Sequence, residues 1–537
     1  MVKEEPRSKS TLSVYVYEPQ CHGCVVCVRA CPTKAIRIRN DKAMILPDLC
    51  VDCAECIRVC PQKAIIPRVS TYQDLARFKV TALLPSPVIY TQFGPEILPN
   101  EILLALTKRG FDYVFDLAKY CEWCNLAISA WLADHPEVRT AISPLCPVVA
   151  HLIAAKFPDL IPNLVPLAPP REFGARHVRR FLRRRLGLDD RDIGVFYVTP
   201  CPAKMVAIDQ PLGLERSYLN GALGMHTVYG DVLKALKELT DEDRETMIFQ
   251  ASGFGIDWGA GGLGLAENTL VVSGLSETLE VLEQVESGRL KGVRYIESRI
   301  CPDGCLGGPL TVENRFLSRN TLRQLVQMFG AKPRARLKDI ASLLEEGFCL
   351  TNREIKPNIF RLDPDPLEAM KRLKKVDQLT SRLPGKQCAV CGAPDCRTLA
   401  EDVVLGRADL FVCPLYFRLR TWGRRKMKLS EIVDKLELKV LTAPGALERE
   451  VTGVYTSDLL SDVMANSKSG QLWVTLQGHV NVVAVAVLRE LAGIVLVNNR
   501  TPAEDTAAKA AEDNLPILQS DLPAFELCGR LYSLLAA

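Results

Sequence analysis

Residues 296–310 read IESRICPDGCLGGPL, and two shorter upstream stretches match this pattern: SPLCP at 143–147 and TPCPAK at 199–204. Each stretch places cysteine beside proline or glycine, directly after an apolar run. Together they supply four thiols, those of Cys146, Cys201, Cys301 and Cys305. Thiolates are the ligands that iron–sulfur clusters require, so four thiols from three loops predict one iron–sulfur cube. The alternative is that these are buried apolar cysteines.

The three loops, in this order, resemble the signature loops of the iron-only (diiron) hydrogenases. The resemblance spans about residues 80–360 and implies a two-lobed α/β domain over 69–360. It implies that the four cysteines hold a cube and that Cys305 bridges it to a two-iron unit with carbonyl and cyanide ligands. By the same resemblance, Lys204 is the catalytic-site residue that would point at a cyanide of the diiron unit.

The chain departs from the catalytic members of that family at the proton path. Leu145 stands where they have a proton-relay cysteine, and a leucine cannot ionise to pass protons. Ala207 replaces a glutamate, and Ala127 and Ile128 fall where they carry paired glutamates. Arg299 replaces a methionine two residues before the third-loop cysteine. A site with ligands for the cube but without the proton wire resembles the sensory or regulatory branch of the family.

Residues 12–68 contain an internal repeat in which Cys-x2-Cys-x2-Cys-x3-Cys-Pro occurs twice. This is the bacterial dicluster ferredoxin pattern, in which the fourth cysteine of each run ligates the other cluster. It predicts two 4Fe–4S clusters in an α+β domain over 1–68, one held by Cys21, Cys24, Cys27 and Cys60 and the other by Cys50, Cys53, Cys56 and Cys31. Zinc is the alternative metal for Cys-x2-Cys pairs. Short helices are expected after each run, at 33–35 and 62–64.

From residue 69 the pattern alternates between apolar strands and amphipathic helices, which predicts parallel sheets. The three cysteine loops follow strands that end at 142, 198 and 296, and open α/β sheets bind ligands at such carboxyl ends. Further strands are expected at 80–84, 113–116, 247–251 and 270–272. The glycine-rich stretch 253–264 predicts turns over the cofactor or a plain loop rather than a phosphate site.

Two further segments complete the predicted organisation. A small helical module over 375–420 resembles the 4Fe–4S modules of anaerobic redox proteins, with zinc as its alternative metal; its cysteines are Cys388, Cys391, Cys396 and Cys413, and one helix is expected over 398–410. Residues 428–537 nearly lack cysteine and resemble the DRTGG family, an α/β regulatory or docking module, with strands expected at 439–441, 451–455, 472–475, 482–487, 493–497 and 517.

Cys121 and Cys124, in YCEWCN at 120–125, form an additional pair that catalytic members of the hydrogenase family do not have. Two thiolates make half of a metal site, which Cys349 could complete, or the pair simply packs in a core. The spacing leaves both interpretations open.

Composition sets limits on the class of protein. The chain has 537 residues and a net charge of +4, so no global field for nucleic acid is indicated. No apolar run reaches the length of a membrane span, and the first ten residues lack a signal core. Twenty cysteines then point to metal rather than to disulfides, in the cytoplasm of an anaerobic or microaerobic host.

Three functional hypotheses follow. The first is a hydrogen or redox sensor, or a regulatory hydrogenase-like electron-transfer protein, with three 4Fe–4S clusters plus the central cube. The second is a catalytic ferredoxin-linked hydrogenase with another proton path, through Cys121, Cys124 or Glu122. The third is an electron-transfer subunit with only a cube in its central pocket. The expected partner is a ferredoxin, a hydrogenase subunit or a signalling protein.

Overall fold

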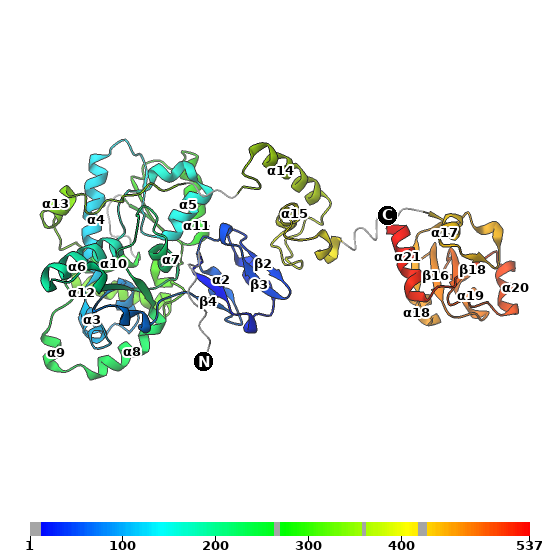
Figure 1. Ribbon diagram of the computed structural model, residues 1–537, viewed down its shortest axis with the longest axis horizontal. Helices are drawn as coiled ribbons and strands as arrows, with labels where there is room; N and C mark the ends of the chain where they lie inside the picture. Colours follow the sequence, from blue (N-terminus) through cyan, green and yellow to red (C-terminus); the bar gives the residue numbers. More distant parts are fainter. Residues whose placement is uncertain (1–11, 262–268, 357–360, 417–426, 537) are drawn as a thin grey trace. The chain divides into compact units, whose positions relative to one another are not determined.

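The computed structural model describes residues 12–261, 269–356, 361–416 and 427–536 (Figure 1). The first ten residues, residues 262–264 of the glycine-rich stretch and residues 417–420 of the predicted module lie outside the described residues. The chain divides into two compact units, residues 1–373 with 387–398, and residues 374–386 with 399–537. No helix among the described residues is both long enough and apolar enough to cross a membrane.

The N-terminal part of the first unit is a small α+β fold. Strand β1 (Val14–Val16) pairs antiparallel with β4 (Ile65–Pro67), and β2 (Ile36–Arg39) forms a hairpin with β3 (Lys42–Ile45). Helices α1 (Val26–Ala30) and α2 (Glu55–Val59) lie within the cysteine runs. The prediction of helices after the runs is wrong: these residues form turns in which Lys34 and Lys63 have φ of +55° and +49°, a conformation that a right-handed helix cannot contain.

The central part of the first unit has two parallel sheets. One has the order β6-β5-β8-β9 and the other the order β10-β11-β7. Their bounds are β5 Val80–Pro85, β6 Tyr113–Val114, β7 Ala141–Ile142, β8 Ile193–Thr199, β9 Gly221–Gly224, β10 Thr269–Ser273 and β11 Tyr295–Arg299. All seven residues of β8 are buried, as expected where helices cover both faces of a parallel sheet.

Helices fill the connections of this part: α3 Pro99–Thr107, α4 Leu117–Asp134, α5 Pro147–Lys156, α6 Pro170–Leu186, α7 Ala203–Asp209, α8 Met225–Glu238, α9 Asp241–Glu245, α10 Gly253–Ala260, α11 Leu275–Glu286, α12 Arg315–Phe329 and α13 Leu337–Glu345. Two sequence predictions are wrong here. The segment 247–251 is not a strand, because the amides of Gln250 and Ala251 donate to the Asp116 carboxylate instead of a neighbouring strand. The glycine-rich stretch opens with the helix α10 rather than with turns.

The C-terminal α/β domain, yellow to red in Figure 1, has a five-stranded sheet in the order β13-β18-β17-β16-β15. Only β13 runs antiparallel to its neighbour. The strands are β13 Lys439–Val440, β15 Gly453–Thr456, β16 Gln471–Thr475, β17 Gly493–Leu496 and β18 Ile517–Gln519, and β12 Met427–Lys428 pairs with β14 Glu450–Val451. Apolar residues alternate between two cores, one on each face of the sheet.

Helices α17 Leu429–Leu436, α18 Leu460–Asn466, α19 Asn481–Leu488, α20 Glu504–Glu512 and α21 Ala524–Ala536 belong to this domain. The prediction of a strand at 482–487 is wrong, since this apolar run is the helix α19, and a short apolar run alone does not distinguish the two structures. Helices α14 (Pro366–Ser381) and α15 (Cys396–Val404) precede this domain in the sequence. The helix expected over 398–410 ends at Val404, shortly before Gly406, whose φ is +70°.

Candidate functional site

The three cysteine loops lie at the carboxyl ends of strands from both parallel sheets. Cys146 follows β7 and Cys201 follows β8, whereas Cys301 and Cys305 follow β11. All four thiols line one cavity. The sequence-predicted ligands, although they come from three loops far apart in the sequence, are therefore brought together around a single space.

The glycines of the third loop allow close backbone contact inside and between loops. A Cβ on Gly307 would lie 2.1 Å from the carbonyl oxygen of Pro302, and one on Gly308 would lie 2.4 Å from that of Pro200. The amide of Leu310 donates to the same Pro200 oxygen at 3.0 Å. The second and third loops are thus joined directly, and glycine is required because no side chain fits between them.

Burial disfavours ionisation of the cavity thiols. It raises the pKa of Cys201, and the pKa of Cys301 is also raised by burial, although the Arg58 guanidinium opposes that effect. Arg58 belongs to the N-terminal fold and donates to the carbonyl oxygen of Gly307 at 2.5 Å. The thiolate is the reactive form, so these buried thiols are poor nucleophiles, and a bound metal would deprotonate any thiol that coordinates it.

Lys204 places a buried cation at the cavity wall. Its Nζ lies 3.8 Å from Cys305 Sγ and donates to the Tyr197 hydroxyl at 3.2 Å. Burial acts to lower the pKa of Lys204, but the interaction with Cys305, whose thiolate form the ammonium would stabilise, raises that pKa. The ammonium group therefore stays charged beside the cysteine expected to bridge two metal centres.

The cavity also contains two hydrogen-bond donors without acceptors. Among the described residues, neither Arg171 Nε nor Trp258 Nε1 has a hydrogen-bond partner, and both side chains are over nine-tenths buried. Unpaired buried donors are costly, so they indicate a ligand with acceptor atoms.

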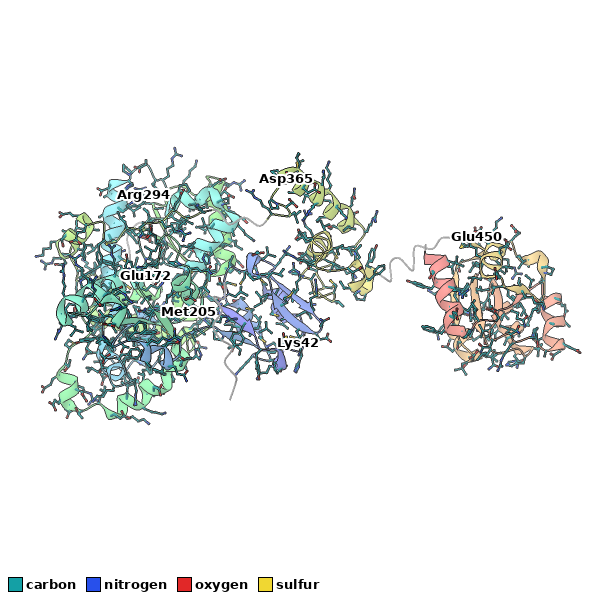
Figure 2. The ribbon with its side chains drawn as sticks, in the orientation of Figure 1. Lys42, Glu172, Met205, Arg294, Asp365 and Glu450 are labelled. Carbon is teal, nitrogen blue, oxygen red and sulfur yellow. The ribbon has the colours of Figure 1, made fainter. Side chains whose placement is uncertain are left out.

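Glu172, the residue after Arg171 on α6, is labelled in Figure 2 and does not line the cavity. It accepts from Ser217 Oγ at 2.8 Å and from the Tyr218 amide at 2.9 Å.

The four departures from the catalytic pattern occupy distinct positions. Leu145 lines the cavity and so presents an apolar side chain there, and Arg299 also lines it. Arg299 is paired with the buried carboxylate of Glu297 and donates to the Trp258 carbonyl oxygen at 2.5 Å. Ala207 and the pair Ala127 and Ile128 are buried and lie outside the set that lines the cavity.

Cys121 and Cys124, the additional pair on α4, are both buried in the core that contains Cys349. They differ at the cavity: Cys121 lines it, whereas Cys124 does not and donates to the Ala168 carbonyl oxygen at 3.6 Å. Glu122 is also buried, and it accepts from Ser252 Oγ at 2.6 Å and from the Arg334 and Ala335 amides at 2.8 and 2.9 Å. Its carboxylate is thus occupied in fixing neighbouring segments.

The N-terminal fold holds two further cysteine cavities. One is lined by Cys21, Cys24, Cys27 and Cys60, and the other by Cys31, Cys50, Cys53 and Cys56. The fourth cysteine of each run therefore lies in the cavity of the other run. The second of these cavities shares Asp52 and Cys53 with the central cavity.

The cysteines of the small module fall in both units. Cys388, Cys391 and Cys396 belong to the first unit, and Cys413 belongs to the second, where it is buried. The module's ligand set stays a prediction.

Three family models match the chain. Residues 79–212 and 230–309 match the C-terminal domain of the iron-only hydrogenase large subunit, and this range includes all four cysteines of the central cavity. The chain contains an iron-only hydrogenase domain. Residues 20–64 match a 4Fe–4S dicluster domain, and residues 383–415 match a putative Fe–S cluster family. The chain is therefore a hydrogenase-like iron–sulfur redox protein.

Individual relatives are more distant. One component of the ion-translocating oxidoreductase complex of Azoarcus sp. (strain BH72) is 38% identical over 100 residues, which are 18% of this chain and 46% of that protein. The chain thus matches about half of that relative's length. An FeFe-hydrogenase structure from Chlamydomonas reinhardtii is 16% identical, with a TM-score of 0.43, over 54% of this chain and 97% of that one. The CBS and DRTGG domains of a Clostridium perfringens pyrophosphatase align over 21% of this chain and 47% of theirs, at 12% identity and a TM-score of 0.17.

Among the side chains of the cavity wall that sequence reasoning missed are those of Tyr197, Arg171 and Trp258. Tyr197 stands four residues before Cys201 on β8, so its proximity could have been inferred from the strand. Arg171 and Trp258 come from helices far from any cysteine motif, and no local signal marks them.

Proposed function

We propose that the protein is a hydrogen or redox sensor, or a regulatory electron-transfer protein, built on a hydrogenase domain. The cavity supports this proposal. Four thiols and the buried Lys204 line it, and the position of the proton-relay cysteine is occupied by Leu145, which does not ionise. Without a proton relay, fast hydrogen turnover is not expected. The state of the metal site would instead be reported through other parts of the chain.

The residues of the cavity fit the group that the family implies. Cys146, Cys201, Cys301 and Cys305 would hold the cube, with Cys305 also bound to the diiron unit. Lys204, Arg171 and Trp258 supply donors for acceptor atoms such as cyanide nitrogens, and the two unpaired donors gain partners only when such a ligand is present. When bound, this group supplies reversible one-electron chemistry and a site for hydrogen. The chain's own residues would fix its orientation and exclude water from it.

Iron counting on anaerobically prepared protein tests the cofactor assignment. Four cubes give about 16 irons, and a diiron unit adds two. Infrared bands of carbonyl and cyanide ligands test for the diiron unit. Their absence from protein matured with the diiron precursor would leave the third hypothesis, an electron-transfer subunit with a cube only.

Hydrogen evolution by matured protein tests the sensory role. We expect slow turnover in the natural protein and an increase in Leu145→Cys, because a thiol would restore a relay at the cavity wall. Leu145→Ser is the control, since it makes a similar cavity without a comparable acid. Turnover at the level of a typical hydrogenase in the natural protein would refute the proposal.

A catalytic hydrogenase with an unusual proton path is the second candidate. It is favoured by one observation, the position of Cys121 in the cavity wall, where its thiol could act in place of the missing relay. Glu122 and Cys124 do not line the cavity and support this candidate less.

The remaining parts of the proposal concern organisation and partners. The proposed domain limits are 1–68, 69–360, 375–420 and 428–537. The DRTGG-like C-terminal domain would be the output or docking module. A redox protein such as a ferredoxin, a hydrogenase subunit or a signalling protein is the proposed partner, and the cytoplasm of an anaerobe the proposed location. The Azoarcus relative belongs to an oxidoreductase complex of several subunits, which agrees with a redox partner.

A further inference from the structure

The first half of the small module packs on the N-terminal ferredoxin fold. Residues 387–398 belong to the first unit, although their neighbours in sequence on both sides belong to the second. The Ile38 amide on β2 donates to the Gly392 carbonyl oxygen at 2.9 Å, which adds a backbone bond at the edge of the hairpin. Ala389 is 1% exposed and lies in the ferredoxin core. The segment is thus part of that fold by hydrogen bonding and by burial.

Side chains reinforce this contact at two further points. Arg29 Nη2, from α1, donates to the Cys388 carbonyl oxygen at 2.8 Å. Lys34 Nζ pairs with Asp395 Oδ2 at 2.7 Å. Asp395 Oδ1 also accepts from the Thr398 amide at 2.8 Å. These contacts lie on both sides of the Cys-x2-Cys turn. They therefore fix the orientation of the turn on the hairpin as well as its distance from it.

Gly392 shows how closely the two backbones approach. Its φ is +76°, and a Cβ at this position would lie 2.2 Å from the Ile38 carbonyl oxygen. Any other residue would be strained in this conformation and would also push the segment away from β2. The glycine of the Cys-Gly pair is therefore required by the contact with the ferredoxin fold.

Ile38 also lines the cavity of Cys21, Cys24, Cys27 and Cys60. The other ferredoxin cavity is the one that shares Asp52 and Cys53 with the hydrogenase cavity. The two ferredoxin cavities share no lining residue, but cysteines of both belong to one hydrophobic core. These contacts give an order: hydrogenase cavity, then the Cys31 and Cys50–Cys56 cavity, then the Cys21 cavity, then the 387–398 segment.

We propose that residues 387–398 are a docking element that fixes Cys388, Cys391 and Cys396 beside the Cys21 cavity. The segment is then a terminal extension of the ferredoxin domain, on the side away from the hydrogenase cavity. The proposal rests on the cluster assignments of the proposed function. The chemistry of two such sites when loaded is exchange of one electron, in which one site is oxidised and its neighbour reduced with no bond made and no proton moved.

Hydrogen exchange of the anaerobic full-length protein tests the docking. In the natural protein, peptides covering β2 and 387–398 should both be protected. Gly392→Ala should raise their exchange at least about tenfold, because the Ile38 bond is lost. Gly406→Ala is the matched control: its φ is also positive, at +70°, but a Cβ there meets nothing within 4 Å, so β2 should keep its protection. Unchanged exchange of β2 in Gly392→Ala, or no protection of 387–398 in the natural protein, would overturn the docking.

A charge swap serves if Gly392→Ala does not fold. Lys34→Glu should raise exchange in the same two peptides, and Lys34→Glu combined with Asp395→Lys should restore protection. Failure of the double variant to restore it, after an effect of the single one, would refute the ion pair as part of the docking.

Magnetic interaction between reduced clusters tests the adjacency itself. Electron paramagnetic resonance of protein with a full iron content should show coupling of the module's signal to a ferredoxin signal, which Gly392→Ala removes while the coupling within the ferredoxin pair persists. Coupling that is absent from the natural protein, or unchanged in the variant, overturns the proposal. An iron content four short of the full value would instead refute the module's cluster assignment, and hydrogen exchange would still decide the docking.

Discussion

Lys204 holds its Nζ 3.8 Å from the sulfur of Cys305, the cysteine proposed to join the cube to the diiron unit. The lysine comes from α7 after the second loop and the cysteine from the third loop, so the contact links two lobes of the hydrogenase domain. It is buried, and a buried charge is poorly screened by salt. The electrostatic potential at the cube should therefore depend on this one side chain.

Lys204→Met should lower the reduction potential of the central cube. At an effective dielectric constant of about 20, a unit charge roughly 6 Å away is worth about 2–3 kcal/mol, on the order of 100 mV for one electron. A redox titration followed by electron paramagnetic resonance measures the shift. Tyr197→Phe is the control, since it removes a hydrogen bond of Lys204 but keeps the charge. Equal potentials in the natural protein and Lys204→Met would show that the lysine does not act on the cube.

Trp258→Phe should affect the empty and the loaded protein differently. In the empty protein the substitution removes a buried donor that has no partner among the described residues, so the loss in free energy of unfolding should be limited to the cavity left by the smaller ring, on the order of 1–2 kcal/mol. In loaded protein the cyanide bands should shift, because one donor is lost. Thermal unfolding of both forms and infrared spectra test this. Unchanged cyanide bands in the loaded variant would show that the indole does not donate to the ligand.

The sequence predicted which cysteines gather around the central cavity and the two ferredoxin cavities, since each of these loops is a local motif. The ferredoxin repeat and the three Cys-Pro or Cys-Gly loops can be read without knowledge of tertiary structure. Arg171 could not be predicted, because it reaches the cavity from the start of α6, whose sequence is dominated by the basic run that follows. Trp258 lies in a glycine-rich stretch that suggests a loop, whereas the structure has the helix α10 there, packed against α4 and α12.

The errors of secondary structure have a common cause in tertiary contacts. Residues 247–251 have the composition of a strand, but a single buried carboxylate, Asp116, takes the amide hydrogens that a neighbouring strand would need. Strand β9 was not predicted, since its sequence GALG lacks β-branched residues. The docking of 387–398 was also invisible in the sequence, because Gly392 meets β2 across a separation of several hundred residues.

Gly308→Ala should destabilise the junction of the second and third loops. The new Cβ would lie 2.4 Å from the Pro200 carbonyl oxygen, and overpacking of this kind costs about 1–3 kcal/mol. Iron should be released at a temperature lower by about 2–4 °C per kcal/mol, as followed by visible absorbance under anaerobic conditions. Gly230→Ala, on α8, is the control, because a Cβ there meets nothing within 4 Å and should be neutral or stabilising. Identical release temperatures for the two variants would contradict the close approach of the loops.

Cys121→Ser and Cys124→Ser should differ, although both thiols are buried on the same helix. Cys121 lines the cavity, as Leu145 does, whereas Cys124 is bonded to the Ala168 carbonyl oxygen, and burial raises the pKa of both thiols. If the slow turnover of matured protein uses the Cys121 thiol, turnover should fall by about 10²-fold or more in Cys121→Ser. That factor is the lower end of what a positioned proton donor contributes. In Cys124→Ser, turnover should stay within about twofold of the natural protein.

The carbonyl bands distinguish a proton path from simple packing in the same two variants. A cavity-wall residue next to the diiron unit should shift these bands when it is changed, so Cys121→Ser should move them and Cys124→Ser should not. Equal turnover in both variants with shifted bands in Cys121→Ser would exclude the thiol as a relay but keep it in the wall. Loss of turnover in Cys124→Ser alone would contradict the geometry, because Cys124 does not line the cavity and its thiol donates to the Ala168 carbonyl oxygen. Only the combination of lost turnover and shifted bands in Cys121→Ser would favour a catalytic hydrogenase over a sensor.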